Sequence, residues 1–503
     1  MPISKREVKP VSVVMGALLT VGMRWTDRLI GIVSTLILAR LLLPEDFGIV
    51  AMASIIVGLI GTLLDLGVVS ALVQNKHAAR EEFDTAWTLR LMQAVLVALF
   101  IWPLAPLAAE YFRDSRVQDV IRVMALTVVI GGFENIGIVA FWKNMEFGRD
   151  FQFFFFRRIA GFVVTIALAF WMHSYWAMVI GAVVGRTVGV GLSYVFHDYR
   201  PRFSMKRLKQ IWSFSQWILV RNFGGYALGE IDKFLVGRRT DTATMGSYAL
   251  ADEIAAMPGA ELLAPLGRVL FPAFVSVADD SERLRAMFCK AFGVQTLFAL
   301  PAAVGLAMVA GDAVPLLLGE RWLSVIQLVQ TLALIGGLSA LTHSGGYVLL
   351  ALGKVSLQAL IFWLLLGAFV FLATIIFPDA GAQGLARIRL ATSALGLILY
   401  AALVSYYIDA LRLSDFVKHA WRPVLSTGIM ALALSLLPRL EFVALFLQLF
   451  LSIFFGVAIY GCAVLILWRI SGSQEGAEIY LLEQLRIKER FLRWMRMSQL
   501  IGE

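Results

Sequence analysis

The sequence contains little charge, little cysteine and no polar linker. Only 16% of its 503 residues are charged, against about 25% in an average soluble protein. A soluble chain of this length would divide into several cores joined by polar segments, and no such segment is present. The two cysteines, Cys289 and Cys462, are far apart, and the five histidines are scattered without ligand spacing. We therefore expect no disulfide framework, no metal and no cofactor.

Motifs that carry enzyme chemistry are also lacking. The sequence has no Walker A loop, zinc-binding helix, nucleophile elbow or dinucleotide-binding glycine fingerprint. The longest predicted outside loop, near 105–117, leaves little room for a catalytic segment. We therefore expect that the protein is not an enzyme, and that any transport is passive or coupled to an ion gradient or the membrane potential.

Long apolar runs dominate the sequence. Hydrophobic residues make up 59% of the chain, and runs of membrane-spanning length follow one another from Val11 to Trp468. They lack the alternation of barrel strands. We predict an all-α polytopic membrane protein with about fourteen transmembrane helices. The predicted helices span 12–42, 46–73, 83–104, 118–141, 152–172, 175–197, 211–237, 245–275, 287–311, 322–349, 356–377, 381–407, 421–438 and 442–468.

Lysine and arginine are divided unequally between the two sides of this map. With the N-terminus inside, the inside segments hold 27 of them, the outside loops 7, and the helices 10. Because basic residues accumulate on the cytoplasmic side, both termini are predicted to be cytoplasmic. The net charge of +9 then reflects orientation, and nucleic acid is not an expected partner.

The two ends of the chain have patterns of their own. A basic N-terminal patch precedes an apolar run that lacks a small-residue cleavage site, so we expect a retained helix and not a signal peptide. Residues 471–503 are predicted to be a cytoplasmic tail. Its pattern fits an amphipathic helix on membrane lipids and, equally, an ordinary solvated helix.

A short motif occurs twice at an offset of 198 residues. ILARLLLPEDFGIVAMA (37–53) aligns with FLVGRRTDTATMGSYALA (234–251), which places Arg40 on Arg238 and Gly48 on Gly246. Six predicted helices separate the copies, so the copies share one orientation. Transporters are often built from such halves. The predicted parts are an N-terminal lobe at 1–205, a C-terminal lobe at 206–410, two further helices at 411–470 and the tail.

Charged side chains within predicted helices are the candidates for a substrate site, because charges are costly in lipid and usually face a wet cavity. Arginines suit a phosphate group, since the guanidinium binds its oxygens with two hydrogen bonds. Deep carboxylates suit proton or cation coupling, while purely structural ion pairs are the alternative. Near helix ends, Arg90, Arg122, Lys233 and Arg389 are expected to extend to the interface. The candidates for the cavity are Arg24, Asp27, Arg28, Asp65, Arg221, Glu230, Asp232, Glu253, Glu261 and Arg268.

The stretches ILARLLLPEDFGIVAMASII (37–56) and DLGVVSALVQNK (65–76) resemble bacterial oligosaccharide flippases. These form the polysaccharide-transporter branch of the multidrug/oligosaccharidyl-lipid/polysaccharide exporter superfamily. The resemblance continues in EIDKFLVGRRTDTATMGSYALADEIAAMP (230–258) and LLLGERWLSVIQLVQTLALIGGL (316–338). It extends to about residue 410 and places the family's aspartate on Asp232, with Gly237 following.

This resemblance implies two six-helix lobes around a central cavity, working by alternating access. The implied substrate is an undecaprenyl-pyrophosphate-linked oligosaccharide. It would be flipped across the bacterial inner membrane for lipopolysaccharide O-antigen, capsule or exopolysaccharide biosynthesis. The expected partners are this lipid-linked substrate, membrane lipids, and the polysaccharide polymerase or export machinery. An ion-coupled drug antiporter of the same superfamily, a membrane O-antigen polymerase or ligase, and a non-transporting scaffold remain alternatives.

Overall fold

The computed structural model describes residues 13–63, 72, 80–143, 146–206, 216–409, 411–437 and 444–471. The chain forms two compact units. The first unit comprises Met1–Leu250, Leu317–Ser324 and Asp379–Leu385, and the second comprises Ala251–Leu316, Val325–Pro378 and Ala386–Glu503. The lobe boundaries expected from the sequence stay a prediction.

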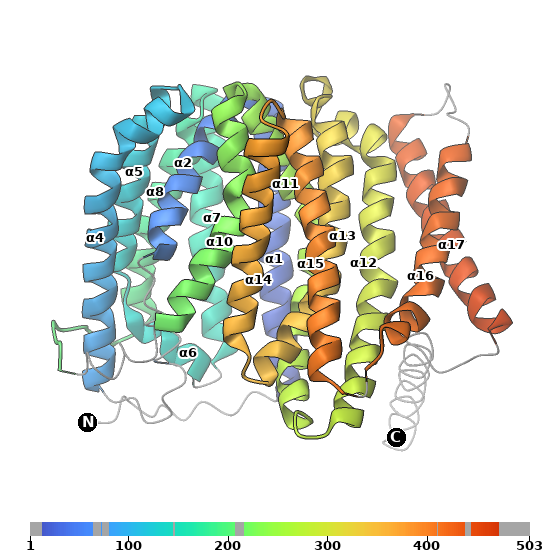
Figure 1. The fold of residues 1–503 in the computed structure, drawn as a ribbon. Helices are drawn as coiled ribbons and strands as arrows, with labels where there is room; N and C mark the ends of the chain where they lie inside the picture. The colour runs from blue at the N-terminus through green and yellow to red at the C-terminus, as the bar shows by residue number, and fades with distance from the viewer. Residues whose placement is uncertain are drawn as a thin grey trace, which may run out of the picture. The chain divides into compact units, whose positions relative to one another are not determined.

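The described residues form helices and no strands (Figure 1). In chain order through the first unit the helices are α1 (Val13–Leu41), α2 (Pro44–Leu63), α4 (Arg80–Phe112), α5 (Arg116–Gly132), α6 (Val139–Lys143), α7 (Phe147–Met172), α8 (Trp176–Phe196) and α10 (Gln216–Arg239). The later helices are α11 (Thr242–Ser276), α12 (Ser281–Leu317), α13 (Val325–Ala351), α14 (Val355–Phe371), α15 (Ala382–Tyr407), α16 (Leu413–Leu436) and α17 (Leu445–Ile470). The predicted all-α class is confirmed, and each predicted range overlaps a helix.

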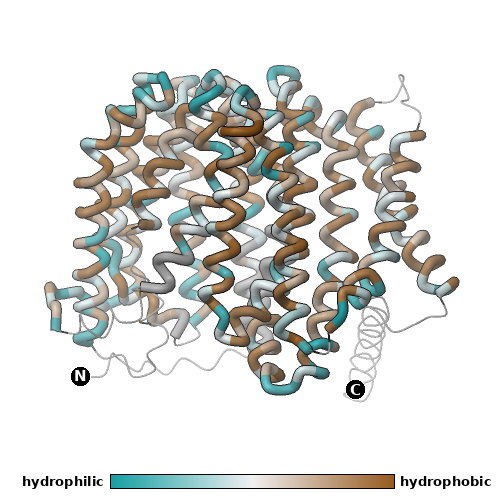
Figure 2. Tube along the Cα trace, viewed as in Figure 1, coloured by the Kyte–Doolittle hydropathy of each residue, from teal (hydrophilic) through white to brown (hydrophobic). Residues whose placement is uncertain are grey.

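Hydrophobic residues predominate along these helices (Figure 2). Large side chains such as Leu99, Trp171 and Val195 are exposed, as suits contact with lipid chains. Among the described residues, nine helices are long and apolar enough to cross a membrane. The protein is therefore a multi-pass membrane protein, while the full count of fourteen spans stays a prediction.

The fourth predicted helix, 118–141, is not continuous, and this prediction was wrong. Helix α5 ends at Gly132, and the chain resumes as a 3₁₀ turn at Ile136–Ile138 and then α6. Figure 1 shows α5 beside the upper part of α4, and α6 near the bottom of the view. The side chain of Asn135 accepts a hydrogen bond from the Gly137 backbone, 2.9 Å away. An asparagine that bonds local backbone in this way competes with the helix, and the break follows.

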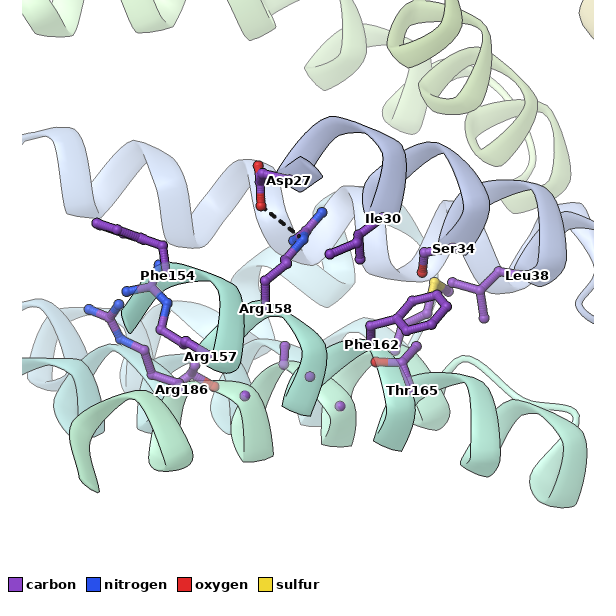
Figure 3. A pocket seen from close by; sticks show the side chains of 16 residues that line it. Asp27, Ile30, Ser34, Leu38, Phe154, Arg157, Arg158, Phe162, Thr165 and Arg186 are labelled. Atoms are coloured by element: carbon purple, nitrogen blue, oxygen red, sulfur yellow. Dashed lines mark ion pairs between the residues drawn. The ribbon is translucent and has the colours of Figure 1, made fainter. Parts of the chain in front are cut away.

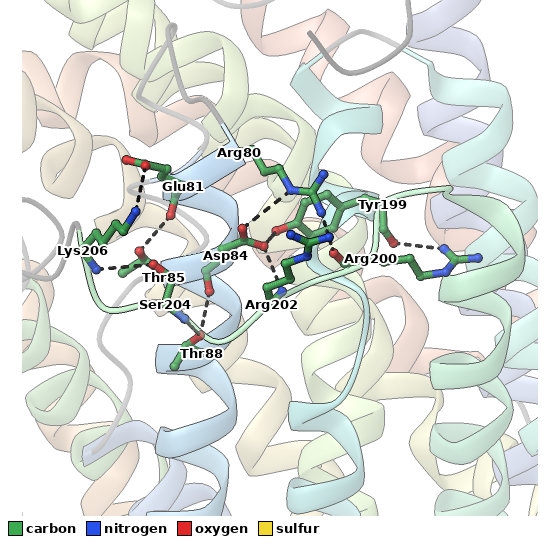
Figure 4. Close-up of polar contacts among 10 residues, drawn as sticks. All are labelled: Arg80, Glu81, Asp84, Thr85, Thr88, Tyr199, Arg200, Arg202, Ser204 and Lys206. Atoms are coloured by element: carbon green, nitrogen blue, oxygen red, sulfur yellow. Dashed lines mark hydrogen bonds and ion pairs between the residues drawn. The ribbon is translucent and has the colours of Figure 1, made fainter. Parts of the chain in front are cut away.

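The 197–206 segment, which follows α8, is bound to the start of α4 (Figure 4). The buried carboxylate of Asp84 accepts hydrogen bonds from the Tyr199 hydroxyl and from the Arg202 backbone N–H, the latter at 2.9 Å. The Ser204 N–H donates to the Thr88 hydroxyl at 3.0 Å. Burial, and then the neighbouring Asp84, raise the pKa of Tyr199 far above its ordinary value, so its hydroxyl remains a donor.

The two copies of the repeated motif pack against each other inside the first unit. A Cβ atom added at Gly48 would lie 2.0 Å from the Thr242 carbonyl oxygen, and one added at Gly246 would lie 1.8 Å from the Pro44 carbonyl oxygen. The starts of α2 and α11 therefore meet backbone to backbone. Small residues permit such close approach between membrane helices.

The arginines of the repeated motif make matching contacts. Arg40, near the end of α1, donates to the Leu317 carbonyl at 3.1 Å. Arg238, near the end of α10, donates to the Tyr111 carbonyl at 2.8 Å. Each acceptor lies in the last turn of a helix, where carbonyls lack a partner within the helix. The aligned sequence positions therefore perform the same structural task.

A methyl group at Gly246 cannot be relieved by side-chain rotation, because it would meet backbone atoms. We expect Gly246→Ala to destabilise the protein by at least the ~1–3 kcal/mol typical of overpacking, measured as a lower Tm of purified protein in detergent. Gly191→Ala in α8 is the control, since nothing lies within 4 Å of its added Cβ. Equal Tm values for the two variants would contradict the described contact.

Candidate functional site

A cavity of about 480 Å³ lies within the first unit, between α1, α5, α7 and α8 (Figure 3). Its lining combines charged, hydroxyl and apolar side chains with three glycines. The residues are Asp27, Ile30, Ser34, Leu38, Thr127, Phe154, Arg157, Arg158, Gly161, Phe162, Thr165, Met178, Gly181, Ala182, Gly185 and Arg186. The space is large enough for a small-molecule group or a part of a larger ligand.

The charged groups lie at one end of this cavity. Three arginines and one aspartate line it, so the lining carries an excess of positive charge. The Asp27 carboxylate forms an ion pair with the Arg158 guanidinium at 3.1 Å. In Figure 3, Arg157 and Arg186 extend side by side. Arg158 lies between this pair and the hydroxyl-bearing residues Ser34 and Thr165.

Behind the cavity, the carboxylate of Glu134 contacts three guanidinium groups. Arg90 approaches Oε2 to 2.6 Å, while Arg157 lies 3.4 Å from Oε1 and Arg186 lies 3.6 Å from Oε2. The Glu134 side chain is only 4% exposed. Arg90 is thus held tightly, whereas Arg157 and Arg186, which also line the cavity, are held more loosely.

The break between α5 and α6 places Glu134 at this position. Its neighbour Asn135 donates hydrogen bonds to the carbonyls of Tyr199, at 2.6 Å, and His197, at 3.2 Å. The Asn135 backbone N–H donates to the Ser193 hydroxyl at 2.9 Å. These bonds fix the broken segment against the end of α8, so the adjacent Glu134 is directed at the arginines.

One carboxylate against three guanidiniums leaves this cluster with a net positive charge. Attraction between charges strengthens as water is excluded, and a guanidinium is a rigid donor suited to phosphate oxygens. The cavity-lining arginines can therefore bind an anionic group that enters from the cavity. The hydroxyls of Ser34 and Thr165, which also line it, can bond polar groups further along.

Among the residues predicted from the sequence, Asp27 lines the cavity, and Arg28, Glu230 and Asp232 do not. Glu230 pairs with Lys233 at 3.0 Å. Asp232 is fully buried and accepts a hydrogen bond from the Tyr248 hydroxyl at 2.5 Å. Glu253 is an exposed residue of the second unit. Whether any of them contacts substrate stays a prediction.

The remaining predicted residues cannot be placed in this site. Asp65 lies outside the described residues, as does the predicted tail from residue 472. Arg24, Arg221, Glu261 and Arg268 lie on described helices, but their side chains are outside the described part of the structure.

Sequence reasoning missed the main basic residues of the cavity. Arg157 and Arg158 fall near the start of the predicted helix 152–172, were counted among the inside basic residues and were not named as candidates, whereas α7 begins at Phe147 and carries them well within the helix. The signal was the aromatic run FQFFFFRR at 151–158, which is too apolar for a solvated segment. Arg90 was expected to extend to the interface, and this was wrong, because it contacts the buried Glu134.

Removal of the Glu134 carboxylate leaves three guanidiniums facing one another. We expect Glu134→Ala to destabilise the protein by about 3 kcal/mol, as when one partner of a buried ion pair is deleted, seen as a lower Tm in detergent. Asp119→Ala is the control, since the Asp119 side chain is 65% exposed and lies 3.8 Å from Arg122. A Tm for Glu134→Ala as high as that of Asp119→Ala would show that Glu134 does not hold the cluster together.

The chain is similar in sequence to known proteins of polysaccharide biosynthesis. The lipopolysaccharide biosynthesis protein WzxC of Escherichia coli (strain K12) is 26% identical over 337 residues, covering 65% of this chain and 68% of WzxC. The succinoglycan biosynthesis transport protein ExoT of Rhizobium meliloti (strain 1021) is 26% identical over 329 residues, covering 65% of this chain and 66% of ExoT.

The fold is also that of a solved structure. The lipid II flippase MurJ, in an inward closed conformation, superposes with a TM-score of 0.71 at 13% identity, covering 91% of this chain and 99% of MurJ. A family model described as polysaccharide biosynthesis protein matches residues 37–327, which is more than half of the chain. As the resemblance predicted, the chain belongs to the polysaccharide biosynthesis protein family.

Proposed function

We propose that the protein is a flippase for a lipid-linked oligosaccharide. The substrate would be an undecaprenyl-pyrophosphate-linked oligosaccharide unit used for lipopolysaccharide O-antigen, capsule or exopolysaccharide biosynthesis. The observation that carries the proposal is the cavity lined by Arg157, Arg158 and Arg186 inside a unit whose outer surface is apolar. A diphosphate is the group that such a cavity would bind.

The chemistry of the cavity favours a diphosphate over a neutral or cationic ligand. Its only carboxylate among the lining residues, Asp27, is already paired with Arg158. Arg157 and Arg186 face Glu134 at 3.4 and 3.6 Å, which are long contacts. An anion in the cavity would gain short charge-assisted hydrogen bonds from both. A cationic drug would meet repulsion from the same groups.

The family supports a transport role. The related ExoT is a succinoglycan biosynthesis transport protein, and several helices of this chain are long and apolar enough to cross a membrane. A lipid-linked sugar cannot cross a bilayer unaided, because its diphosphate and hydroxyls are costly in hydrocarbon. A polar cavity within a membrane-spanning unit lowers this barrier.

The orientation, transport cycle and coupling site that we propose rest on the sequence analysis. Both termini would face the cytoplasm of a bacterial inner membrane, in accord with the distribution of Lys and Arg. The two lobes would alternate in access, with the cavity opening first to the cytoplasmic leaflet and then to the periplasmic leaflet. The buried carboxylate of Asp232 is the proposed position for ion coupling, since it lies at the aligned family position.

The anion site can be tested by equilibrium binding of farnesyl diphosphate to purified protein in detergent. We expect Arg157→Gln and Arg186→Gln each to weaken binding about tenfold or more, since a hydrogen bond to a charged group contributes about 1.5–3 kcal/mol. The matched control is Arg149→Gln, because Arg149 is also on α7 but pairs with Glu146 and does not line the cavity. Undiminished binding in both variants would contradict the proposed site.

A further inference from the structure

A second, smaller pocket of about 270 Å³ adjoins the cavity between α1 and α7. The two share the residues Asp27, Ile30, Phe154, Arg157 and Arg158. The arginines therefore border both spaces. We name the smaller space the aromatic pocket, because the residues that it adds to the shared set are Met23, Thr26, Phe151 and Phe155.

The phenylalanines form one face of α7. Phe151, Phe154, Phe155 and Arg158 follow a spacing of three, one and three residues, which places them on one side of a helix. The rings of Phe151 and Phe155 stack with centroids 5.8 Å apart and an interplanar angle of 13°. The guanidinium carbon of Arg157 lies 5.1 Å from the ring centroid of Phe154. The aromatic face thus leads directly into the cationic end of the cavity.

The two spaces differ in what they can bond. The hydroxyl of Thr26, the one polar group that the aromatic pocket adds, already donates to the Gly22 carbonyl at 2.8 Å. The larger cavity adds Ser34, Thr127 and Thr165. Polarity therefore changes along the site, from aromatic through cationic to hydroxyl-bearing. A molecule with an apolar chain, a diphosphate and a sugar presents these chemistries in the same order.

We propose that the aromatic pocket binds the isoprenoid chain next to the diphosphate, while the diphosphate lies at Arg157 and Arg158 and the sugar extends towards Ser34 and Thr165. This inference rests on the proposed function, since it assigns a subsite to the same substrate. Burial of apolar surface favours binding roughly in proportion to the area removed from water, so a longer chain in the pocket should bind more tightly. The pocket thereby selects a prenyl diphosphate over a free diphosphate.

The test compares inorganic pyrophosphate, geranyl diphosphate and farnesyl diphosphate as ligands of the purified full-length protein in one detergent. For the wild type, we expect affinity to rise from pyrophosphate to farnesyl diphosphate by at least about tenfold, a gain of roughly 1.4 kcal/mol. For Phe151→Ala and Phe155→Ala, we expect most of this gain to disappear, with the affinity for pyrophosphate unchanged.

Two further variants distinguish the loss of contacts in the aromatic pocket from misfolding and from nonspecific effects of a phenylalanine substitution on α7. Phe170→Ala changes an exposed phenylalanine near the other end of α7 that borders neither space, so the chain-length dependence should remain. Phe155→Leu keeps apolar volume and should retain most of the gain, provided that its Tm matches that of the wild type. Because Phe155→Ala and Phe155→Leu alter the same site, their difference distinguishes lost contact from misfolding.

Two results would overturn the inference while leaving the proposed function intact. One is diphosphate binding with no dependence on chain length. The other is a chain-length gain that Phe151→Ala and Phe155→Ala do not reduce, which would place the isoprenoid elsewhere or in detergent alone. Failure of the wild type to bind any of the three ligands would instead overturn the proposed function, and this inference with it.

Discussion

The buried carboxylate of Glu134 is the interaction on which the site depends. Three guanidiniums converge on it, and none of them could gather there without a negative charge, since like charges repel strongly where water is scarce. Arg90 holds one oxygen at 2.6 Å, which leaves Arg157 and Arg186 at longer range on the cavity side. The protein thereby keeps two arginines ordered but available to a ligand.

The position of Glu134 depends in turn on a polar network at one end of the first unit. The side chain of Asn135 binds carbonyls of the 197–206 segment, and that segment is bound to Asp84 on α4 through Tyr199 and Arg202. Helix α4 also carries Arg90. Helix α4 therefore fixes both the break after α5 and Arg90, which is the partner nearest to Glu134. The hydrogen bonds that hold the broken segment also direct the Glu134 carboxylate at the arginines.

Hydropathy alone predicted the all-α class and located helices at every predicted range, except for the break after Gly132, because an apolar run of spanning length is rarely anything but a transmembrane helix. The repeated motif aligned Gly48 with Gly246, and the structure gives these two glycines matching backbone contacts. The helix break was not predicted: Asn135 bonds the nearby Gly137 N–H, but the partners that fix the broken segment, Ser193 and Tyr199, lie about sixty residues away in sequence. Arg157 and Arg158 were missed because they stand near the start of the predicted helix 152–172, whereas α7 begins five residues earlier, at Phe147, and places them deeper in the helix. Asp27 was identified because its neighbours, Arg24 and Arg28, mark a charged helix face.

Transbilayer movement is the most direct test of the account. Purified protein would be reconstituted into vesicles that carry a fluorescent prenyl-diphosphate-linked oligosaccharide in the inner leaflet, and its exposure to an impermeant sugar-oxidising reagent would be followed. The account predicts rapid exposure with the wild-type protein and with Arg149→Gln, and a rate near that of protein-free vesicles for the double variant Arg157→Gln/Arg186→Gln. Exposure by the double variant at the wild-type rate, or none by folded wild-type protein, would contradict it.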